Sequence, residues 1–365
     1  MDIKDYSSRY NELTGKFLQN MFLEADGGNV VMSPFSILML LGIASQSTSG
    51  VTRDEIKEFF GHNCTFDEII CMLLNLQNNL SSYDSFISSN VVCINEILKE
   101  SVNPAYKNEL SKFGGELFCS KNIVDDINQC VKKYTRGLIK NIADDSIKDM
   151  IACLLNAVAF EAQWQDPYDE ECDIYQDVFH NSNRTESSVQ MLCSTENYYI
   201  EDDNYTGFIR PYKDFEYSFM ALLPKRRGQL YIENVLGCTD FTNLYKGMQP
   251  NKVNVRIPEF QYEYTKELKD LCIEVGISTI FSLGADFSPM VTGKLRLDSI
   301  RHKARIEVDR KGTKAAAVTI GCAVPGAAFS HEECKTIHLD RPFVYAIMDD
   351  RTDLPVFVGV MNKAD

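Results

Sequence analysis

The sequence predicts an α+β fold, on three observations. Apolar residues recur at helical spacing over roughly the first 150 residues, and short apolar runs of strand length follow them. The composition, with 44% hydrophobic and 24% charged residues, is that of an ordinary globular protein. A helix-rich part followed by a strand-rich part is typical of the α+β class. Because the composition is even and no repeat or linker interrupts it, residues 1–365 are expected to form one domain.

Four helices are expected before residue 150. Ser33 is the predicted N-cap of one of them, because Pro34 fits the first turn of a helix and an apolar run over residues 35–41 follows. Apolar stripes predict two more helices over residues 10–21 and 127–142, and a further helix is expected over residues 52–60.

Strands are expected to dominate after residue 150. Residues 152–164 form a long apolar run, which fits a strand buried on both faces. Shorter strands are expected over residues 217–223, 252–258, 304–308, 344–348 and 355–360.

The charge balance excludes several classes of partner. The chain has 37 basic and 52 acidic residues, a net charge of −15, whereas nucleic acids and heparin-like polymers require a basic surface. We therefore expect neither as a partner, and we interpret the longest basic cluster, Lys225, Arg226 and Arg227, as a solvated loop. No apolar run is long enough to cross a membrane and no secretory leader precedes the chain, so a cytoplasmic protein is expected, with export by a leaderless route as the alternative.

Motifs typical of enzymes and metal sites are missing from the sequence. Its twelve cysteines include no C-x-x-C pair, and no G-x-S-x-G, H-E-x-x-H, P-loop or G-x-G-x-x-G motif occurs. The chain is therefore not expected to be an enzyme, and no cofactor or metal is expected.

One segment near the C-terminus has an unusual composition. Between Gly312 and Ser330 the one charged side chain is Lys314. If this segment is a strand, one face carries only small side chains, at positions 313, 315, 317, 319, 321 and 323. Such a face allows a strand to enter a sheet above a filled core without overpacking, and Pro325 would end the strand. The plainer interpretation is an ordinary buried strand or an Ala- and Gly-rich loop.

Several segments, in the same order, resemble the serpins, the serine-protease-inhibitor superfamily. Residues 29–37 are similar to the family's N-x-x-x-S-P-x-S-I segment, and residues 156–167 to its N-x-x-x-F…W…P strand. Residues 308–317 resemble the family's hinge, and residues 340–343 and 357–359 resemble its C-terminal signature. The likeness covers residues 29–362, and the missing leader is similar to the intracellular, ovalbumin-like branch.

The resemblance implies a single serpin domain of about nine helices and three β-sheets, with an exposed reactive-centre loop at about residues 310–335. It also implies a metastable monomer that acts by suicide inhibition. The target serine protease cuts the loop and becomes attached to it as a covalent acyl-enzyme. The cut loop then inserts into the large central sheet, and this conformational change traps the protease.

The resemblance also assigns site residues. The hinge comprises Gly312, Thr313, Lys314, Ala315, Ala316 and Ala317. The shutter, a polar cluster under the central sheet, comprises Ser33, Ser36, Asn156 and His302. The breach, where insertion begins, comprises Trp164, Glu259 and Arg310. The family usually has Glu at the position of Arg310 and Lys at that of Glu259, so we expect an ion pair of exchanged sign here. The alternative is that the two are merely surface charges, worth under about 1 kcal/mol.

The bond that a protease would cut has several candidates. The family's usual spacing from Arg310 gives Gly326 and Ala327, and Ala327 or Ala328 would suit an elastase-like protease. Phe329 followed by Ser330 is the better chemical candidate, because Phe fills a chymotrypsin-like pocket. The expected partner is therefore a chymotrypsin- or cathepsin G-like protease, or an elastase-like one.

Two other functions stay open within the same resemblance. Non-inhibitory serpins act as carriers, chaperones or storage proteins, but their hinges often contain charged, bulky or proline residues, unlike the Ala-rich hinge here. The remaining alternative is an inhibitor of papain-like cysteine proteases.

Overall fold

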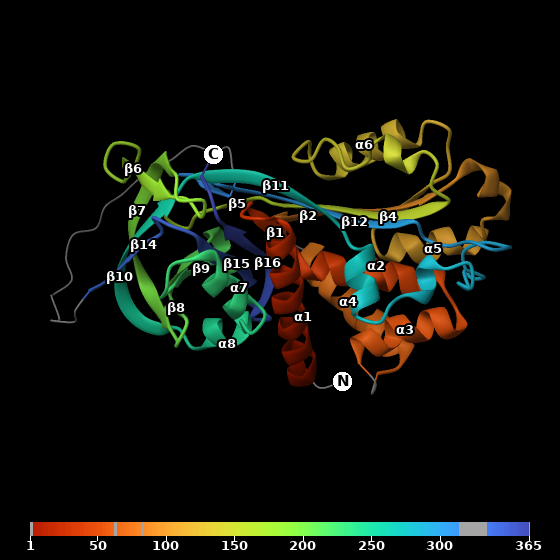
Figure 1. The fold of residues 1–365 in the computed structure, drawn as a ribbon, viewed down its shortest axis with the longest axis horizontal. Coiled ribbons are helices and arrows are strands. Elements are labelled where there is room, and N and C mark those ends of the chain that lie inside the picture. The colour runs from red at the N-terminus through yellow and green to blue at the C-terminus, as the bar shows by residue number, and fades with distance from the viewer. Residues whose placement is uncertain (1–2, 62–63, 82–83, 314–333, 365) are drawn as a thin grey trace. The chain divides into compact units, whose positions relative to one another are not determined.

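The computed structural model describes residues 3–61, 64–81, 84–313 and 334–364. Within these residues, nine α-helices and sixteen strands form two compact units (Figure 1). The first unit contains Met32–Phe160 and Glu263–Arg305, together with the N-terminal residues up to Arg9. The second unit contains Tyr10–Val31, Glu161–Tyr262 and Ile306–Asp365. Each unit is thus assembled from separate segments of the chain, and the assignment of residues 1–365 to one domain stays a prediction.

The helices are α1 (Ile3–Glu24), α2 (Pro34–Ser47), α3 (Gly50–Phe60), α4 (Phe66–Ser81), α5 (Pro104–Lys112), α6 (Ile123–Tyr134), α7 (Gln229–Leu236), α8 (Phe241–Lys246) and α9 (Lys269–Glu274). The strands are β1 (Val30–Met32), β2 (Phe86–Ile94), β3 (Gly115–Phe118), β4 (Ala152–Phe160), β5 (Ala162–Gln163), β6 (Ile174–His180), β7 (Glu186–Glu201), β8 (Tyr205–Pro211), β9 (Tyr217–Pro224), β10 (Gln249–Pro258), β11 (Phe260–Glu267), β12 (Ser299–Val308), β13 (Gly312–Thr313), β14 (Lys335–His338), β15 (Phe343–Asp349) and β16 (Leu354–Met361).

The first unit is built on four neighbouring strands in the order β3-β2-β4-β12. β2 runs antiparallel to β4, and residues 299–305 of β12 run parallel to β4 on its other side. Every residue of β4 is buried, as expected for a strand that is covered on both faces. Helix α6 covers one face of this sheet and α2 lies against the other, which accounts for that burial (Figure 1).

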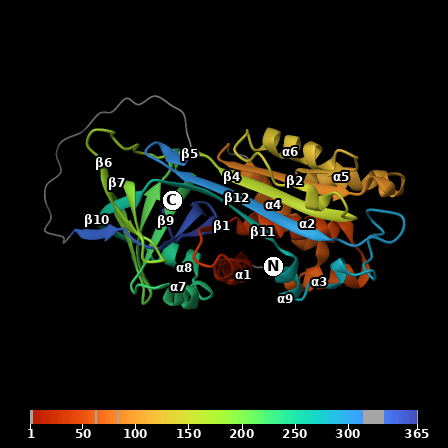
Figure 2. The same cartoon turned by 45° about the horizontal axis from the view of Figure 1, so that its top comes forward.

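The second unit contains a larger network of strands, in the order β1-β16-β15-β9-β8-β7-β10-β14, with β6 paired to β7 (Figure 2). The long strand β7 pairs with β6 through its first residues, 186–192, and with β8 through its last residues, 198–201. It therefore connects β6 to the β8-β9-β15-β16 part of the network. The expected strands over residues 217–223, 344–348 and 355–360 are confirmed as β9, β15 and β16, and all three are buried throughout.

The structure differs from the expected elements at several places. Helix α6 ends at Tyr134 and not at residue 142, because Arg136 and Gly137 have left-handed φ angles of 51° and 78° that an α-helix cannot contain. Residues 86–94 form strand β2 inside the part expected to be mainly helical; polar residues at 88–90 interrupt the apolar run that could have predicted it. The run over residues 152–164 is divided between β4 and β5 at Glu161.

Within the described ranges, no helix contains an apolar stretch of the length that a membrane span requires.

Candidate functional site

The first two hinge residues, Gly312 and Thr313, form strand β13 in the second unit. β13 lies between β12 and β5: Thr313 pairs with Val308 on one side and with Ala162 on the other, both antiparallel. A tight turn over residues 309–312 reverses the chain, and the Asp309 carboxylate accepts hydrogen bonds from the backbone N–H groups of Lys311 (2.8 Å) and Gly312 (3.0 Å). The start of the predicted hinge is therefore already part of a sheet.

Position 312 requires a glycine because the backbones of β13 and β5 lie very close together there. A Cβ atom at this position would lie 2.1 Å from the Ala162 carbonyl oxygen and 2.7 Å from the Gln163 Cα atom. Both neighbours are backbone atoms, which cannot move aside without breaking the pairing. A larger residue at this position would force β13 and β5 apart.

Thr313 is fully buried, and its side chain has a polar partner. Its hydroxyl lies 2.7 Å from the hydroxyl of Tyr212. Burial raises the pKa of Tyr212 well above its ordinary value, so the phenol stays neutral and can exchange a hydrogen bond with Thr313. The buried position of Thr313 thus suits a small side chain with one hydroxyl, and a charged or bulky side chain would not fit there.

Trp164 anchors the turn that leads into β13. Its indole N–H donates a hydrogen bond to the Asp309 carbonyl oxygen (2.9 Å), and its backbone N–H donates to that of Lys311 (3.0 Å). Its ring stacks on Tyr212 with centroids 4.5 Å apart and an interplanar angle of 7°. Trp164 therefore links the turn to the residue that holds Thr313.

Glu259 and Arg310 form the ion pair of exchanged sign. Arg310 Nε lies 3.0 Å from Glu259 Oε1 and its second guanidinium nitrogen, Nη2, lies 3.2 Å from Oε2, so the contact is bidentate. The backbone N–H of Arg310 also donates to Oε1 (3.2 Å), and Glu170 lies 3.5 Å from the guanidinium. The predicted ion pair is therefore formed, and its role in loop insertion stays a prediction.

A second arginine in this region was not predicted. Arg210 is buried against the rings of Trp164 and Tyr168, at 5.0 and 4.1 Å from their centroids, and is paired with the buried Glu196. Neither Arg210 nor Tyr212 belongs to a motif. Their positions on and just after a strand gave no sign that they face Trp164.

The first unit contains the four predicted shutter residues. β12, β4 and β2 are neighbours, and their register places His302 beside Asn156 and Asn156 beside Asn90. His302 Nδ1 lies 2.8 Å from Asn156 Oδ1, while the Asn156 amide donates to Asn90 Oδ1 (2.8 Å) and to Ser88 Oγ (3.1 Å). Asn90 and Ser88 extend the predicted cluster, and only the strand register could have revealed them.

The start of α2 completes the shutter cluster. Ser33 is the N-cap, as predicted, and its Oγ accepts a hydrogen bond from the Ser36 backbone N–H (3.2 Å). The Ser33 backbone N–H donates to His302 Nε2 (3.1 Å). Ser36 Oγ is buried and has no hydrogen-bond partner in the described part of the chain. Ser36 therefore contributes to the shutter cluster through its backbone N–H, which donates to Ser33 Oγ.

The remaining site predictions lie outside the described residues. These are the hinge residues Lys314, Ala315, Ala316 and Ala317 and the candidates for the cut bond, Gly326, Ala327, Ala328, Phe329 and Ser330. They stay predictions from the sequence.

Comparison with known proteins supports the resemblance. The family model described as Serpin (serine protease inhibitor) matches residues 8–364. A serpin-like protein of Thermococcus kodakarensis is 28% identical, over 94% of this chain and 83% of its own length. Iripin-2 of Ixodes ricinus is 29% identical, over 92% of this chain and 88% of its own.

Solved structures give the same result. The native thermophilic serpin tengpin is similar with a TM-score of 0.85 and 28% identity, covering 98% of this chain and 94% of its own. Thyroxine-binding globulin in complex with thyroxine is similar with a TM-score of 0.84 and 24% identity, covering 98% of both chains, a likeness that concerns the fold alone. The fold expected from the sequence is confirmed.

Proposed function

This chain belongs to the serpin family, and we propose that it is an inhibitory serpin that traps a serine protease as a covalent acyl complex. The protease serine attacks a peptide bond of the reactive-centre loop, and the amine side of the cut bond leaves. Residues from Lys314 onward then follow Thr313 into the sheet as an extension of β13. The acyl-linked protease is carried along and cannot complete hydrolysis.

The seating of Thr313 between β12 and β5 is the observation that carries this proposal. A strand whose Thr313 is already paired on both sides, and whose Gly312 is paired with β5, needs no new nucleus to lengthen. The residues that follow, Ala315 and Ala317, continue the small-residue face that Thr313 begins. Both features favour insertion after cleavage, which a trapping inhibitor requires.

The proposed target is a chymotrypsin- or cathepsin G-like protease that cuts after Phe329. An elastase-like protease that cuts within residues 326–328 is the alternative. Neither bond follows Arg or Lys, so a trypsin-like target is not proposed.

Incubation with chymotrypsin, cathepsin G and elastase tests the proposal on a denaturing gel. We expect a complex that survives SDS, and mass spectrometry of the released peptide then identifies the cut bond. Thr313→Arg should be cleaved but form no such complex, because a guanidinium cannot enter the buried position beside Tyr212. Thr292→Arg, at an exposed position outside the strands, is the matched control and should still form the complex.

Two results would contradict the proposal. If Thr313→Arg forms as much complex as the unaltered chain, trapping does not depend on insertion at β13. If all three proteases cut the loop without forming a complex, the chain is a substrate, and a carrier role or inhibition of a papain-like cysteine protease becomes the better interpretation. The likeness to thyroxine-binding globulin does not favour a carrier role in advance, since it shows the fold alone.

A further inference from the structure

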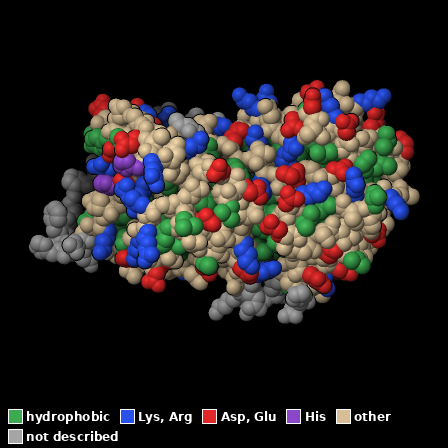
Figure 3. Space-filling view, viewed as in Figure 1, with side chains coloured by type: hydrophobic (Ala, Val, Ile, Leu, Met, Phe, Trp, Pro, Cys, Tyr) green, Lys and Arg blue, Asp and Glu red, His purple; other side chains and the backbone are tan. Residues whose placement is uncertain are grey.

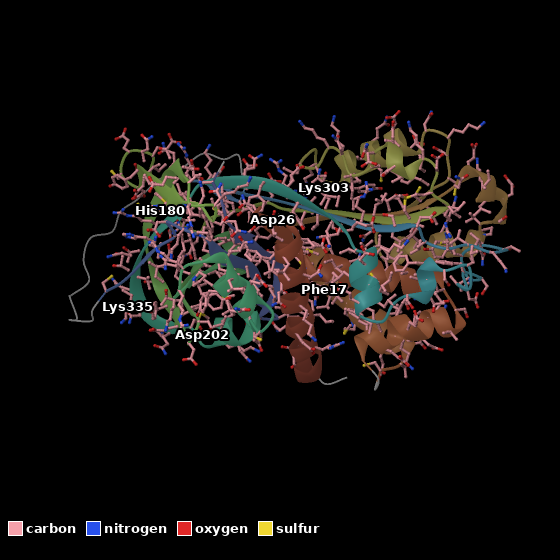
Figure 4. The ribbon with its side chains drawn as sticks, viewed as in Figure 1. Phe17, Asp26, His180, Asp202, Lys303 and Lys335 are labelled. Atoms are coloured by element: carbon pink, nitrogen blue, oxygen red, sulfur yellow. The ribbon has the colours of Figure 1, made fainter. Side chains whose placement is uncertain are left out.

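A basic pocket of about 400 Å³ lies in the second unit, apart from the hinge and the breach residues. Three segments line it: residues 180–186 at the turn from β6 to β7, residues 226–232 at the start of α7, and residues 341–342 before β15. Figure 4 labels His180, which stands at the β6 end of this unit. In the space-filling view, Lys, Arg and His side chains gather over the same region (Figure 3).

The lining is strongly positive in a chain that is strongly negative. It contains four arginines, Arg184, Arg226, Arg227 and Arg341, but one carboxylate, Glu186. Glu186 lies 3.2 Å from His180 Nδ1. The whole chain has a net charge of −15, so its composition does not account for this excess. The solvated loop expected over residues 225–227 is exposed, but that interpretation did not foresee that Arg184 and Arg341 lie with it.

Most of this positive charge is not compensated within the protein. Arg341 pairs with Asp340 (3.2 Å) and donates to the Pro224 carbonyl oxygen (3.1 Å), and Arg226 lies over the Tyr231 ring at 5.6 Å. No carboxylate in the described part of the chain lies within ion-pair distance of Arg184 or Arg227. Uncompensated arginines that share one hollow repel each other, so their convergence favours an anion between them.

The start of α7 adds to the positive potential. Gly228 and Gln229, its N-cap and first residue, line the pocket, and no side chain caps the helix. The first backbone N–H groups of a helix without a cap lack intrahelical partners and carry partial positive charge. Helix starts of this kind bind phosphate groups. This feature therefore acts in the same direction as the four arginines.

We propose that this pocket binds a compact small molecule that carries several phosphate groups. Guanidinium groups bind phosphate oxygens in bidentate fashion, and arginine is the residue suited to this recognition. The volume is that of a small-molecule site, and the lining residues surround one hollow, which suits a compact ligand and not a long polymer. The proposal does not depend on protease trapping, because binding can be measured without a protease.

Isothermal titration calorimetry of the full chain with inositol hexakisphosphate, at fixed ionic strength, tests the proposal. We expect saturable binding at one site. The double variant Arg184→Gln/Arg227→Gln should weaken binding about tenfold or more, because it removes two charge-assisted contacts. Lys121→Gln/Lys132→Gln removes the same charge from exposed positions in and before α6, outside the pocket, and should bind as the unaltered chain does.

A short heparin oligosaccharide is titrated in parallel to separate a phosphate ligand from a sulfated polymer. The proposal is contradicted if inositol hexakisphosphate does not bind, or if only the heparin oligosaccharide does. It is also contradicted if the two double variants weaken binding equally, since that result would indicate a general charge effect. Both variants alter exposed side chains, and thermal unfolding confirms that each is folded. Arg226→Gln should also reduce the affinity and is a second, independent test.

Discussion

The Nε2 atom of His302 accepts a hydrogen bond from the Ser33 backbone N–H, so this nitrogen cannot carry a proton in the folded state. Nδ1, which faces Asn156 Oδ1, must therefore be the protonated nitrogen of a neutral ring. The imidazole is also fully buried, and burial lowers the pKa of His302 to about 3. Hydrogen bonding and desolvation thus both favour the neutral ring.

We predict that His302 makes the unfolding free energy fall as the pH falls from about 6.5 towards 3. Over this range the unfolded chain binds a proton that the folded chain does not, so the loss is about 1.4 kcal/mol per pH unit. His302→Gln keeps a donor and an acceptor but does not titrate, so its stability should vary less with pH. Urea unfolding of both proteins from pH 7 to 4.5 measures the difference.

Comparing the unaltered chain with His302→Gln cancels the effect on stability of other groups that titrate in the same pH range. One of them is Asp350, where burial raises the pKa to about 6; a raised carboxyl pKa stabilises the fold at low pH and acts against His302. Because both proteins contain Asp350, its effect cancels in the difference. If the two pH profiles are parallel, His302 does not control stability in this range.

Among single residues, those inside motifs could be predicted and those reached only through packing could not. The Glu259–Arg310 pair followed from two motif positions whose charges were both reversed. Tyr212, which holds Thr313, belongs to no motif, and its contact spans 101 residues of sequence. The alternation of apolar and polar residues along a strand shows which side chains share a face, but not which distant aromatic ring they will contact.

At the scale of elements, β13 depends on the absence of a side chain at Gly312. We predict that Gly312→Ala lowers the unfolding free energy by about 1–3 kcal/mol, as overpacking does, because the added Cβ would meet the Ala162 carbonyl. It should also reduce the share of SDS-stable complex and increase the share of cleaved product. Urea unfolding and the protease gel measure these two effects.

Gly284→Ala is the control for this prediction. A Cβ at Gly284 would have Ser282 Oγ at 3.5 Å as its nearest contact, which is ordinary van der Waals distance. This variant should match the unaltered chain in both assays. If Gly312→Ala does so too, the close approach of β13 to β5 does not limit insertion.

Elements whose apolar run is broken by at most one polar residue were predicted well from the sequence. The run of β4 contains only Asn156 and the run over residues 35–41 of α2 only Ser36, while β16 contains no polar side chain. β2 was missed because the polar residues at 88–90, which include the shutter partners Ser88 and Asn90, interrupt its run. A functional cluster thus concealed the strand that carries it.

At the scale of the whole molecule, the division into units was not predictable. β4 and β12 are adjacent strands of one unit, yet His302 and Asn156 are 146 residues apart in sequence. Composition is even along the chain and gives no sign of such long-range pairing. The serpin resemblance provided the architecture that local patterns could not.

Cleavage of the reactive-centre loop should change the stability of the whole chain. If residues beyond Thr313 extend β13 once the loop is cut, roughly ten new ladder hydrogen bonds of about 1 kcal/mol each would form. At about 2 °C per kcal/mol for a chain of this size, the melting temperature should rise by roughly 20 °C. Differential scanning calorimetry of the intact and the cut protein, after the protease is inactivated, measures this rise in melting temperature. Thr313→Arg should be cut without gaining it, since its β13 cannot lengthen past a charged side chain. Equal resistance of the intact and cut unaltered chains to heat and urea would mean that the intact fold stores no energy for trapping.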